Sequence, residues 1–284
     1  MAATRGRKAA SNGQRRGRSQ GVRPGQVLAM KSRRSTGAAV ATEPQRLRVA
    51  IIDPHPLARE KVAETVEAVG GEVVWTAGDA HEALASAENA FPDYVVFEFG
   101  LPDSSGAGVL ARMRTHRPSL QGVALSAYDD RAYRALTYLA GALGYLSKSR
   151  SSTDVRAALE EVWSGRVLWT AQEVSMAQTW WSRYGEQWRR LSPRQRAVAT
   201  GVANRATYKE IAARLGLRES TVKGYVQETL AKVRFSTRDE LSAWMETGRL
   251  TDPRVQPLLD LQPNADCLTP DRQRTHASAY APLP

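Results

Sequence analysis

The chain lacks the features that mark secreted and membrane proteins. Its 284 residues include one cysteine, Cys267, so an internal disulfide cannot form, as is typical of a reducing compartment. No stretch approaches the ~18 consecutive apolar residues of a membrane-spanning helix. The basic N-terminus is not followed by the apolar core of a signal peptide. We therefore expect a cytoplasmic protein that makes no contact with a membrane.

Acidic residues are scarce in two segments, so the net charge of +11 is spread unevenly. Residues 1–45 hold ten Lys and Arg and one acid, and residues 188–250 hold thirteen Lys and Arg and six acids. Such basic segments indicate an anionic partner. Residues 1–45 are also nearly free of large apolar side chains, which predicts a disordered basic tail. This tail could follow nucleic-acid phosphates, although a merely solvated tail is the simpler interpretation.

Residues 46–165 alternate short apolar runs with helix-like segments. The runs predict strands at residues 47–52, 72–75, 94–97, 123–126 and 144–146. Helices are expected at residues 56–69, 80–90, 106–114, 131–141 and 153–163. Five strand-then-helix units predict an α/β domain with a doubly wound, parallel, five-stranded sheet. The functional crevice of such a sheet lies at the carboxyl ends of its strands.

Three further segments follow this domain. Residues 166–190 are expected to be a linker whose tryptophans Trp180, Trp181 and Trp188 pack on a neighbouring domain or on a second chain. Residues 191–247 form an all-α domain. Residues 248–284 are rich in proline and polar residues, which predicts a disordered tail.

The all-α segment has the pattern of a helix-turn-helix. Ser192 and Gln195 have the spacing of a capping box that starts a helix, and Thr207 and Glu210 repeat that spacing. Gly216 supplies a turn. The next helix, at residues 219–233, has an apolar stripe on one face and polar residues on the others. A short helix, a glycine turn and a second helix with outward polar residues are typical of DNA-binding modules.

The segments 191–194, 209–212 and 221–223 resemble the LuxR-type DNA-binding domain of the NarL/FixJ response-regulator family. The resemblance is collinear and free of gaps. It implies that the second helix enters the major groove of double-stranded DNA and that a homodimer binds paired half-sites. Dimer contacts are expected from a face of the first domain and from the last helix, near residues 237–245.

The same resemblance assigns roles to individual residues of the helix-turn-helix. It implies that Lys223, Gly224 and Gln227 face bases. It also implies that Lys209, Thr221 and Lys232 contact phosphates, which give affinity without sequence information.

The sequence departs from the family pattern at three positions in this domain. Arg218 stands where a Ser or Thr usually caps the recognition helix, Tyr225 replaces a common His, and Arg205 replaces a common Gly. None of these removes a base-facing group, so they bear on fine specificity rather than on DNA binding itself.

The five strand-helix units resemble the receiver domain of response regulators, a flavodoxin-like fold. A working receiver uses one aspartate that accepts phosphate and two further carboxylates that help to hold Mg²⁺. By this resemblance Asp53 keeps the first acid, but Pro54 stands at the second and offers no side-chain oxygen. Glu98 stands at the phosphoacceptor position in place of aspartate.

The remaining positions of the receiver pocket keep the expected chemistry. Ser126 matches the hydroxyl and Lys148 the lysine that bind the phosphoryl group, and Tyr145 matches the switch aromatic. Because Glu is one methylene longer than Asp, the attacking oxygen is displaced, and in-line phosphoryl transfer tolerates little misplacement. We therefore predict a regulator without metal, cofactor or catalytic residues that is not controlled by aspartyl phosphorylation.

Several alternatives stay open for this degenerate pocket. A Glu98–Lys148 ion pair could hold the domain in one state by partly mimicking a phosphoaspartate, or Glu98 could be a neutral replacement in a domain kept for dimerisation. The crevice could instead bind a small molecule. A conventional phosphorylation-switched regulator and an interaction protein that binds nucleic acid non-specifically are the two rival functions.

Overall fold

The computed structural model describes residues 46–261, and all of these residues belong to one compact unit. The disordered basic tail predicted at residues 1–45 lies outside the described residues, and so does the part of the C-terminal tail at residues 262–284. Within the range that is described, no helix is long and apolar enough to cross a membrane.

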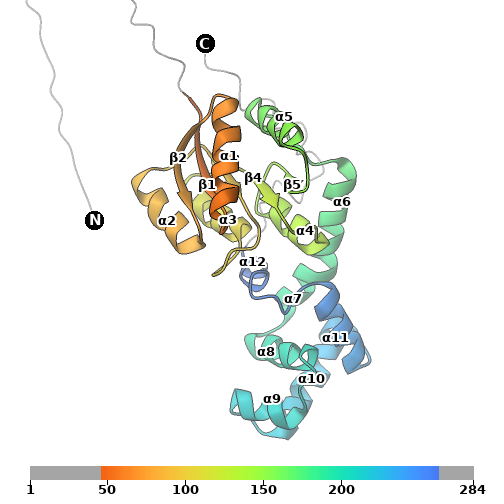
Figure 1. The fold of residues 1–284 in the computed structure, drawn as a ribbon. Coiled ribbons are helices and arrows are strands. Elements are labelled where there is room, and N and C mark those ends of the chain that lie inside the picture. The colour runs from red at the N-terminus through yellow and green to blue at the C-terminus, as the bar shows by residue number, and fades with distance from the viewer. Residues whose placement is uncertain (1–45, 262–284) are drawn as a thin grey trace, which may run out of the picture. The chain divides into compact units, whose positions relative to one another are not determined.

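The sheet has five parallel strands in the order β2-β1-β3-β4-β5. The strands are β1 (Arg48–Ile52), β2 (Glu72–Ala77), β3 (Tyr94–Phe97), β4 (Gln121–Ser126) and β5 (Tyr145–Ser147), as Figure 1 shows. The chain winds in opposite directions on either side of the β1–β3 pair. This switch point is where sheets of this kind place a functional crevice. The predicted fold class is therefore confirmed.

Alternate residues of the inner strands face opposite sides of the sheet, as the period of two in a strand requires. On β1, Val49 and Ile51 pack with α1 (Pro56–Ala68) and α5 (Ser152–Trp163). Ala50 and Ile52 belong to a second core with α2 (Ala80–Asn89), α3 (Gly106–His116) and α4 (Arg131–Leu139). Because helices cover both faces, the central residues of the inner strands are apolar on both sides of the sheet.

The linker predicted at residues 166–190 is mostly helical. It contains α6 (Ala171–Trp180), a π-helical segment η1 (Trp181–Gly185) and α7 (Glu186–Arg190), and α6 packs along α4. Gly185 is needed in η1, because a Cβ there would lie 2.2 Å from the Trp181 ring. All three predicted tryptophans are buried within this chain. They therefore pack on neighbouring elements of this chain, and their burial does not require a second chain.

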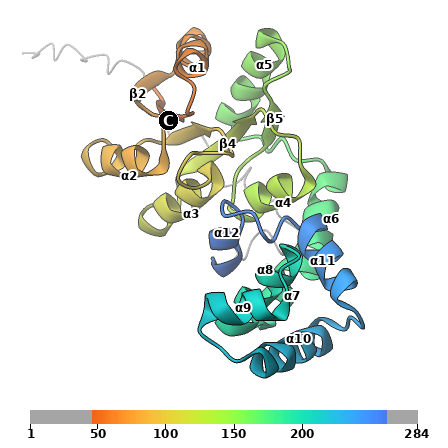
Figure 2. The same cartoon turned by 60° about the horizontal axis from the view of Figure 1, so that its bottom comes forward.

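The C-terminal domain has the predicted helix-turn-helix, as Figure 2 shows. Its helices are α8 (Pro193–Ala203), α9 (Tyr208–Leu215), α10 (Glu219–Val233) and α11 (Arg238–Thr247). Capping boxes start α8 at Ser192 and α9 at Thr207, as predicted, and a further one starts α11 at Thr237. Gly216 ends α9 with a left-handed φ of 64°, a conformation that glycine adopts without steric cost.

The prediction of a disordered tail from residue 248 was wrong for residues 248–261. These residues continue into a short helix, α12 (Gln256–Asp260), and Val255, Leu258 and Leu259 are buried. Helix α12 packs against α3 and α7. The sequence was misleading because the average composition of the segment is polar, whereas three clustered apolar side chains suffice to anchor a short segment by burial.

Candidate functional site

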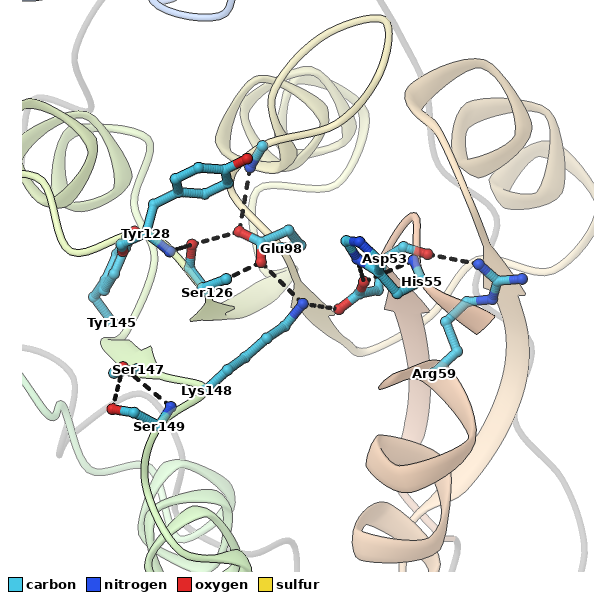
Figure 3. Close-up of polar contacts among 12 residues, drawn as sticks. Asp53, His55, Arg59, Glu98, Ser126, Tyr128, Tyr145, Ser147, Lys148 and Ser149 are labelled. Atoms are coloured by element: carbon cyan, nitrogen blue, oxygen red, sulfur yellow. Dashed lines mark hydrogen bonds and ion pairs between the residues drawn. The ribbon is translucent and has the colours of Figure 1, made fainter. Parts of the chain in front are cut away.

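The strand-end pocket gathers the residues that the sequence singled out. Asp53 follows β1 and Glu98 follows β3, so the two carboxylates flank the switch point of the sheet. Ser126 ends β4, and Lys148 follows β5. Figure 3 shows the four side chains converging on one another. The carboxyl ends of parallel strands meet at one edge, which is why residues far apart in sequence share this site.

Glu98 is 2% exposed, and its carboxylate is saturated with donors. Its Oε1 accepts a hydrogen bond from the Ser126 hydroxyl and, at 3.3 Å, one from the backbone N–H of Gly100. Its Oε2 accepts from the backbone N–H of Ala127 at 2.9 Å and lies 2.9 Å from the Nζ of Lys148. Such full pairing offsets the cost of burying a carboxylate.

Lys148 bridges the two buried acids of the pocket. Its ammonium contacts Oδ2 of Asp53 as well as Oε2 of Glu98, so the ion pair expected between Glu98 and Lys148 is present and is shared with Asp53. Burial lowers the pKa of Lys148, but hydrogen bonds to the two carboxylates and their negative charge outweigh it and raise the pKa above its usual value. The lysine therefore stays charged at neutral pH.

Asp53 is 3% exposed and is held from both sides. Its Oδ1 accepts from the backbone N–H of His55 at 3.0 Å, and the Arg59 guanidinium donates to its backbone carbonyl at 2.6 Å. Pro54, which stands between these groups, brings no side-chain oxygen. A cation in this pocket would therefore have the Asp53 and Glu98 carboxylates as acidic side chains, both already paired with Lys148.

Tyr145 is turned inward and is 5% exposed. Its hydroxyl donates to the backbone carbonyl of Tyr128 at 2.6 Å, and the Arg134 guanidinium lies 4.8 Å from the centre of its ring. Burial and the nearby charge of Glu98 raise the pKa of the phenol above its ordinary value, so it remains a donor. Tyr128 in turn donates its N–H to the Ser126 hydroxyl at 3.1 Å. The β4–α4 loop is thus held at Tyr128 through both the N–H and the carbonyl of that residue.

A cluster that the sequence analysis missed joins the same loop to the C-terminal segment. The hydroxyl of Tyr133 donates to Oδ2 of Asp252 at 2.6 Å, and Nη2 of Arg254 lies 2.9 Å from both of these groups. The Arg254 guanidinium also lies 5.2 Å from the ring centre of Tyr128. We call these four residues the C-terminal cluster. An acid and an arginine two residues apart form no recognisable sequence motif, so the cluster becomes visible only in the folded structure.

Electrostatics reinforce the C-terminal cluster. Burial raises the pKa of Asp252, but the hydrogen bonds from Arg254 and Tyr133 outweigh it and hold the pKa below its usual value. Nearby, Nε of Arg249 pairs with Oδ2 of Asp130 at 2.9 Å. The loop that supplies the Ala127 donor to Glu98 is therefore in direct contact with the segment that follows the helix-turn-helix.

The predicted nucleic-acid interface is solvent-exposed in the structure. Lys209 lies on α9, and Thr221, Lys223 and Gln227 lie on α10, with all four side chains exposed. Lys223 and Gln227 are four residues apart and so share one face of α10. Gly224 has open space where a Cβ would project. Internal packing therefore does not account for the glycine, which leaves room for a close approach from outside.

Lys232 is placed differently from the other predicted phosphate contacts. Its Nζ donates to Oε1 of Gln195 at 2.8 Å, and this same oxygen accepts the backbone N–H of Ser192 at the start of α8. Lys232 is exposed and could still reach a phosphate, but it also ties α10 to α8. Of the three departures from the family pattern, Arg218 gives α10 no side-chain cap, and Arg205 adopts a left-handed φ of 59°. Tyr225 packs against the core.

Comparisons with known proteins agree with this architecture. The family described as response regulator receiver domain matches residues 49–160, and the family described as bacterial regulatory proteins, luxR family, matches residues 189–245. The probable transcriptional regulatory protein NarL of Mycobacterium tuberculosis is 31% identical over 214 residues, which are 74% of this chain and 98% of that protein. The DNA-binding transcriptional activator DevR/DosR of the same organism is 28% identical and covers 70% of this chain and 93% of its own.

Among solved structures, the receiver domain of the M. tuberculosis protein NarL is 30% identical, with a TM-score of 0.41. It covers 43% of this chain and all of its own. The two family matches and the NarL relative define a response regulator, with a receiver domain followed by a LuxR-type helix-turn-helix. The chain belongs to the NarL family of DNA-binding transcriptional response regulators. The family acts by binding DNA and not as enzymes.

Proposed function

We propose that this regulator binds specific duplex DNA sites as a cytoplasmic homodimer, and that aspartyl phosphorylation does not control this binding. The observation that carries the proposal is the Glu98 carboxylate, which occupies the Ser126 hydroxyl, the Ala127 N–H and the Lys148 ammonium. By resemblance, the hydroxyl and the lysine are the groups that would bind a phosphoryl group. The Glu98 carboxylate therefore binds the same hydroxyl and the same lysine that would otherwise bind a phosphoryl group.

Two features argue against phosphoryl transfer to Glu98. An attacking carboxylate oxygen must be free and in line with the donor, whereas each oxygen of Glu98 already accepts two partners. Mg²⁺ also requires several oxygen ligands in near-octahedral geometry, and Pro54 supplies none. We infer that a cation at this site would have to compete with Lys148, whose charge is already balanced by Asp53 and Glu98.

The inward Tyr145 favours a fixed state over a merely degenerate pocket. Its hydroxyl and the Ser126 hydroxyl hold the Tyr128 backbone from opposite ends. Ser126 is in turn held by Glu98. If Glu98 were a replacement without functional effect, removing its charge would leave these contacts unchanged. A small molecule in the same crevice would have to break the ion pairs of Lys148 with Asp53 and Glu98. We therefore favour a pocket that is filled by these internal ion pairs over one that binds a small molecule.

A mass measurement tests independence from phosphorylation. The full chain is incubated with acetyl phosphate and Mg²⁺, and its intact mass is recorded beside that of a NarL-family regulator with an aspartate acceptor as positive control. We expect the control to gain one phosphoryl group and this protein to stay unmodified. A stoichiometric phosphoryl adduct on Glu98 would contradict the proposal and favour the conventional regulator.

Site-specific DNA binding is tested by footprinting. Lys223 and Gln227 share a face of α10, and a good side-chain contact to a base contributes about 1–3 kcal/mol of discrimination. We expect Lys223→Ala and Gln227→Ala to lose protection of a defined paired site. Lys61→Ala, which removes an exposed lysine from α1, should keep it. Equal binding of all sequences with a steep salt dependence would instead support the non-specific interaction protein.

A further inference from the structure

A cavity of about 270 Å³ lies where helix α6 meets α4 and α11, and none of the four strand-end side chains Asp53, Glu98, Ser126 and Lys148 lines it. Arg131 and Arg134 of α4 contribute to its wall, and so do Glu173, Met176 and Trp180 of α6 and Arg183 of η1. Its volume is just below the range of roughly 300–1,000 Å³ typical of drug-sized ligands. The cavity therefore suits a molecule of one small ring or a short chain.

The cavity is rich in positive charge. Three guanidinium groups line it against a single carboxylate, that of Glu173. Arg134 is already paired with Glu173 at 3.1 Å and with Asp129 at 2.7 Å. Arg131 and Arg183 are exposed, and no carboxylate of residues 46–261 forms an ion pair with either. The charge of the wall is thus complementary to an anion.

The wall of the cavity is not charged throughout. Trp180 lines it with a side chain that is 6% exposed and whose indole N–H is buried. The indole ring and the half-exposed Met176 offer apolar surface for the body of such an anion.

The backbone next to the cavity is unusual in the same place. Arg183 and Tyr184 belong to the π-helical segment η1, and both line the cavity. Segments of π-helix occur most often as single turns inside α-helices, frequently at functional sites. Here the wide turn also places Tyr184 against Trp244 of α11, with ring centres 6.1 Å apart.

We propose that this cavity binds a small organic monoanion, with one carboxylate on a compact apolar body. The carboxylate pairs with Arg183 and Arg131, while the apolar body lies against Met176 and the Trp180 ring. Arg134, in the same wall, stacks on Tyr145, so this one side chain links the cavity to the loop beside the strand-end pocket. This site goes beyond the proposed DNA binding, and occupancy is measured without DNA.

Calorimetry on the full chain tests the ligand class. Benzoate, phenylacetate and hexanoate are titrated separately, with benzyl alcohol as the neutral counterpart of benzoate. We expect saturable binding of one equivalent for at least one carboxylate and affinity at least about tenfold weaker for benzyl alcohol, because the alcohol cannot form charge-assisted hydrogen bonds with the arginines. Saturation by none of the three carboxylates would overturn the proposal, and so would equal binding of the alcohol.

Variants then locate the site. Arg131→Gln removes an exposed guanidinium group of the cavity wall and should weaken carboxylate binding about tenfold. Arg183→Gln changes an exposed side chain and should weaken it several-fold. Arg189→Gln, an exposed arginine of α7 outside the cavity wall, is the matched control and should leave it unchanged. Undiminished binding by both Arg131→Gln and Arg183→Gln would place the ligand elsewhere and refute the assignment.

Discussion

Replacing Gly224 by alanine separates the stability of α10 from its proposed role in facing bases. Gly224 lies inside a 15-residue helix, and a Cβ added there meets no atom within 4 Å. Alanine is favoured over glycine by about 1 kcal/mol in a helix interior. With no clash to offset this gain, Gly224→Ala should raise the melting temperature of the transition by roughly 2–4 °C. Scanning calorimetry measures the shift.

The same methyl group should weaken binding to DNA. If Gly224 faces the major groove beside Lys223 and Gln227, the added Cβ separates the helix from the bases, and we expect roughly a tenfold loss of affinity for the specific site. Ala231→Gly, at an exposed position of the same helix, is the inverse control: it should lower stability and leave affinity unchanged. A Gly224→Ala protein that is more stable and binds its site as tightly as before would refute the base-facing placement.

Two further predictions concern the buried charges. Lys148→Met removes the ammonium between two buried carboxylates and should destabilise the receiver by roughly 3–5 kcal/mol in urea unfolding near pH 7. Because the folded pKa of Lys148 is raised, the contribution of the ammonium to stability is full below the unfolded pKa of about 10.4 and is lost as the pH rises through the folded pKa. The difference in unfolding free energy between wild type and variant should therefore close at high pH, and a difference that persists there would contradict the reasoning. Asp252 has a lowered folded pKa, so its contribution is present above about pH 3.9 and disappears as the pH falls through the folded pKa. Asp252→Asn should therefore speed amide exchange in residues 249–261 at neutral pH and not at strongly acidic pH, whereas equal exchange at neutral pH would show that the C-terminal cluster does not hold this segment.

The sequence predicted the elements whose signal is local. Capping boxes at Ser192 and Thr207 fix two helix starts by hydrogen bonds within four residues, and both are present. The apolar runs gave the strands, and β3 has the predicted bounds, Tyr94–Phe97. Strands β2 and β4 are two residues longer than their apolar runs, because pairing with a neighbouring strand extends a strand into polar residues.

The sequence could not predict contacts that depend on burial between distant segments. The resemblance to receiver domains left a Glu98–Lys148 ion pair as one open alternative, and the fold adds Asp53 to that pair. The C-terminal cluster joins Tyr133 to Asp252 across 119 positions, and no local pattern encodes such a contact. Its segment was mistaken for a disordered tail because the average polarity of residues 248–284 concealed the apolar side chains that anchor α12.

The affinity of a Glu98→Gln variant for the specific DNA site tests the central claim most directly. Glutamine keeps the size of the side chain but removes the charge that pairs with Lys148, so a state held by the Glu98 carboxylate should be lost, with a fall in affinity of roughly 5–150-fold as is typical of coupling between sites. Glu98→Asp keeps the charge and shortens the side chain, so its affinity for the DNA site should lie between that of the wild-type chain and that of Glu98→Gln. Identical affinity of Glu98→Gln and the wild-type chain would contradict the account, because the carboxylate would then have no part in setting DNA binding.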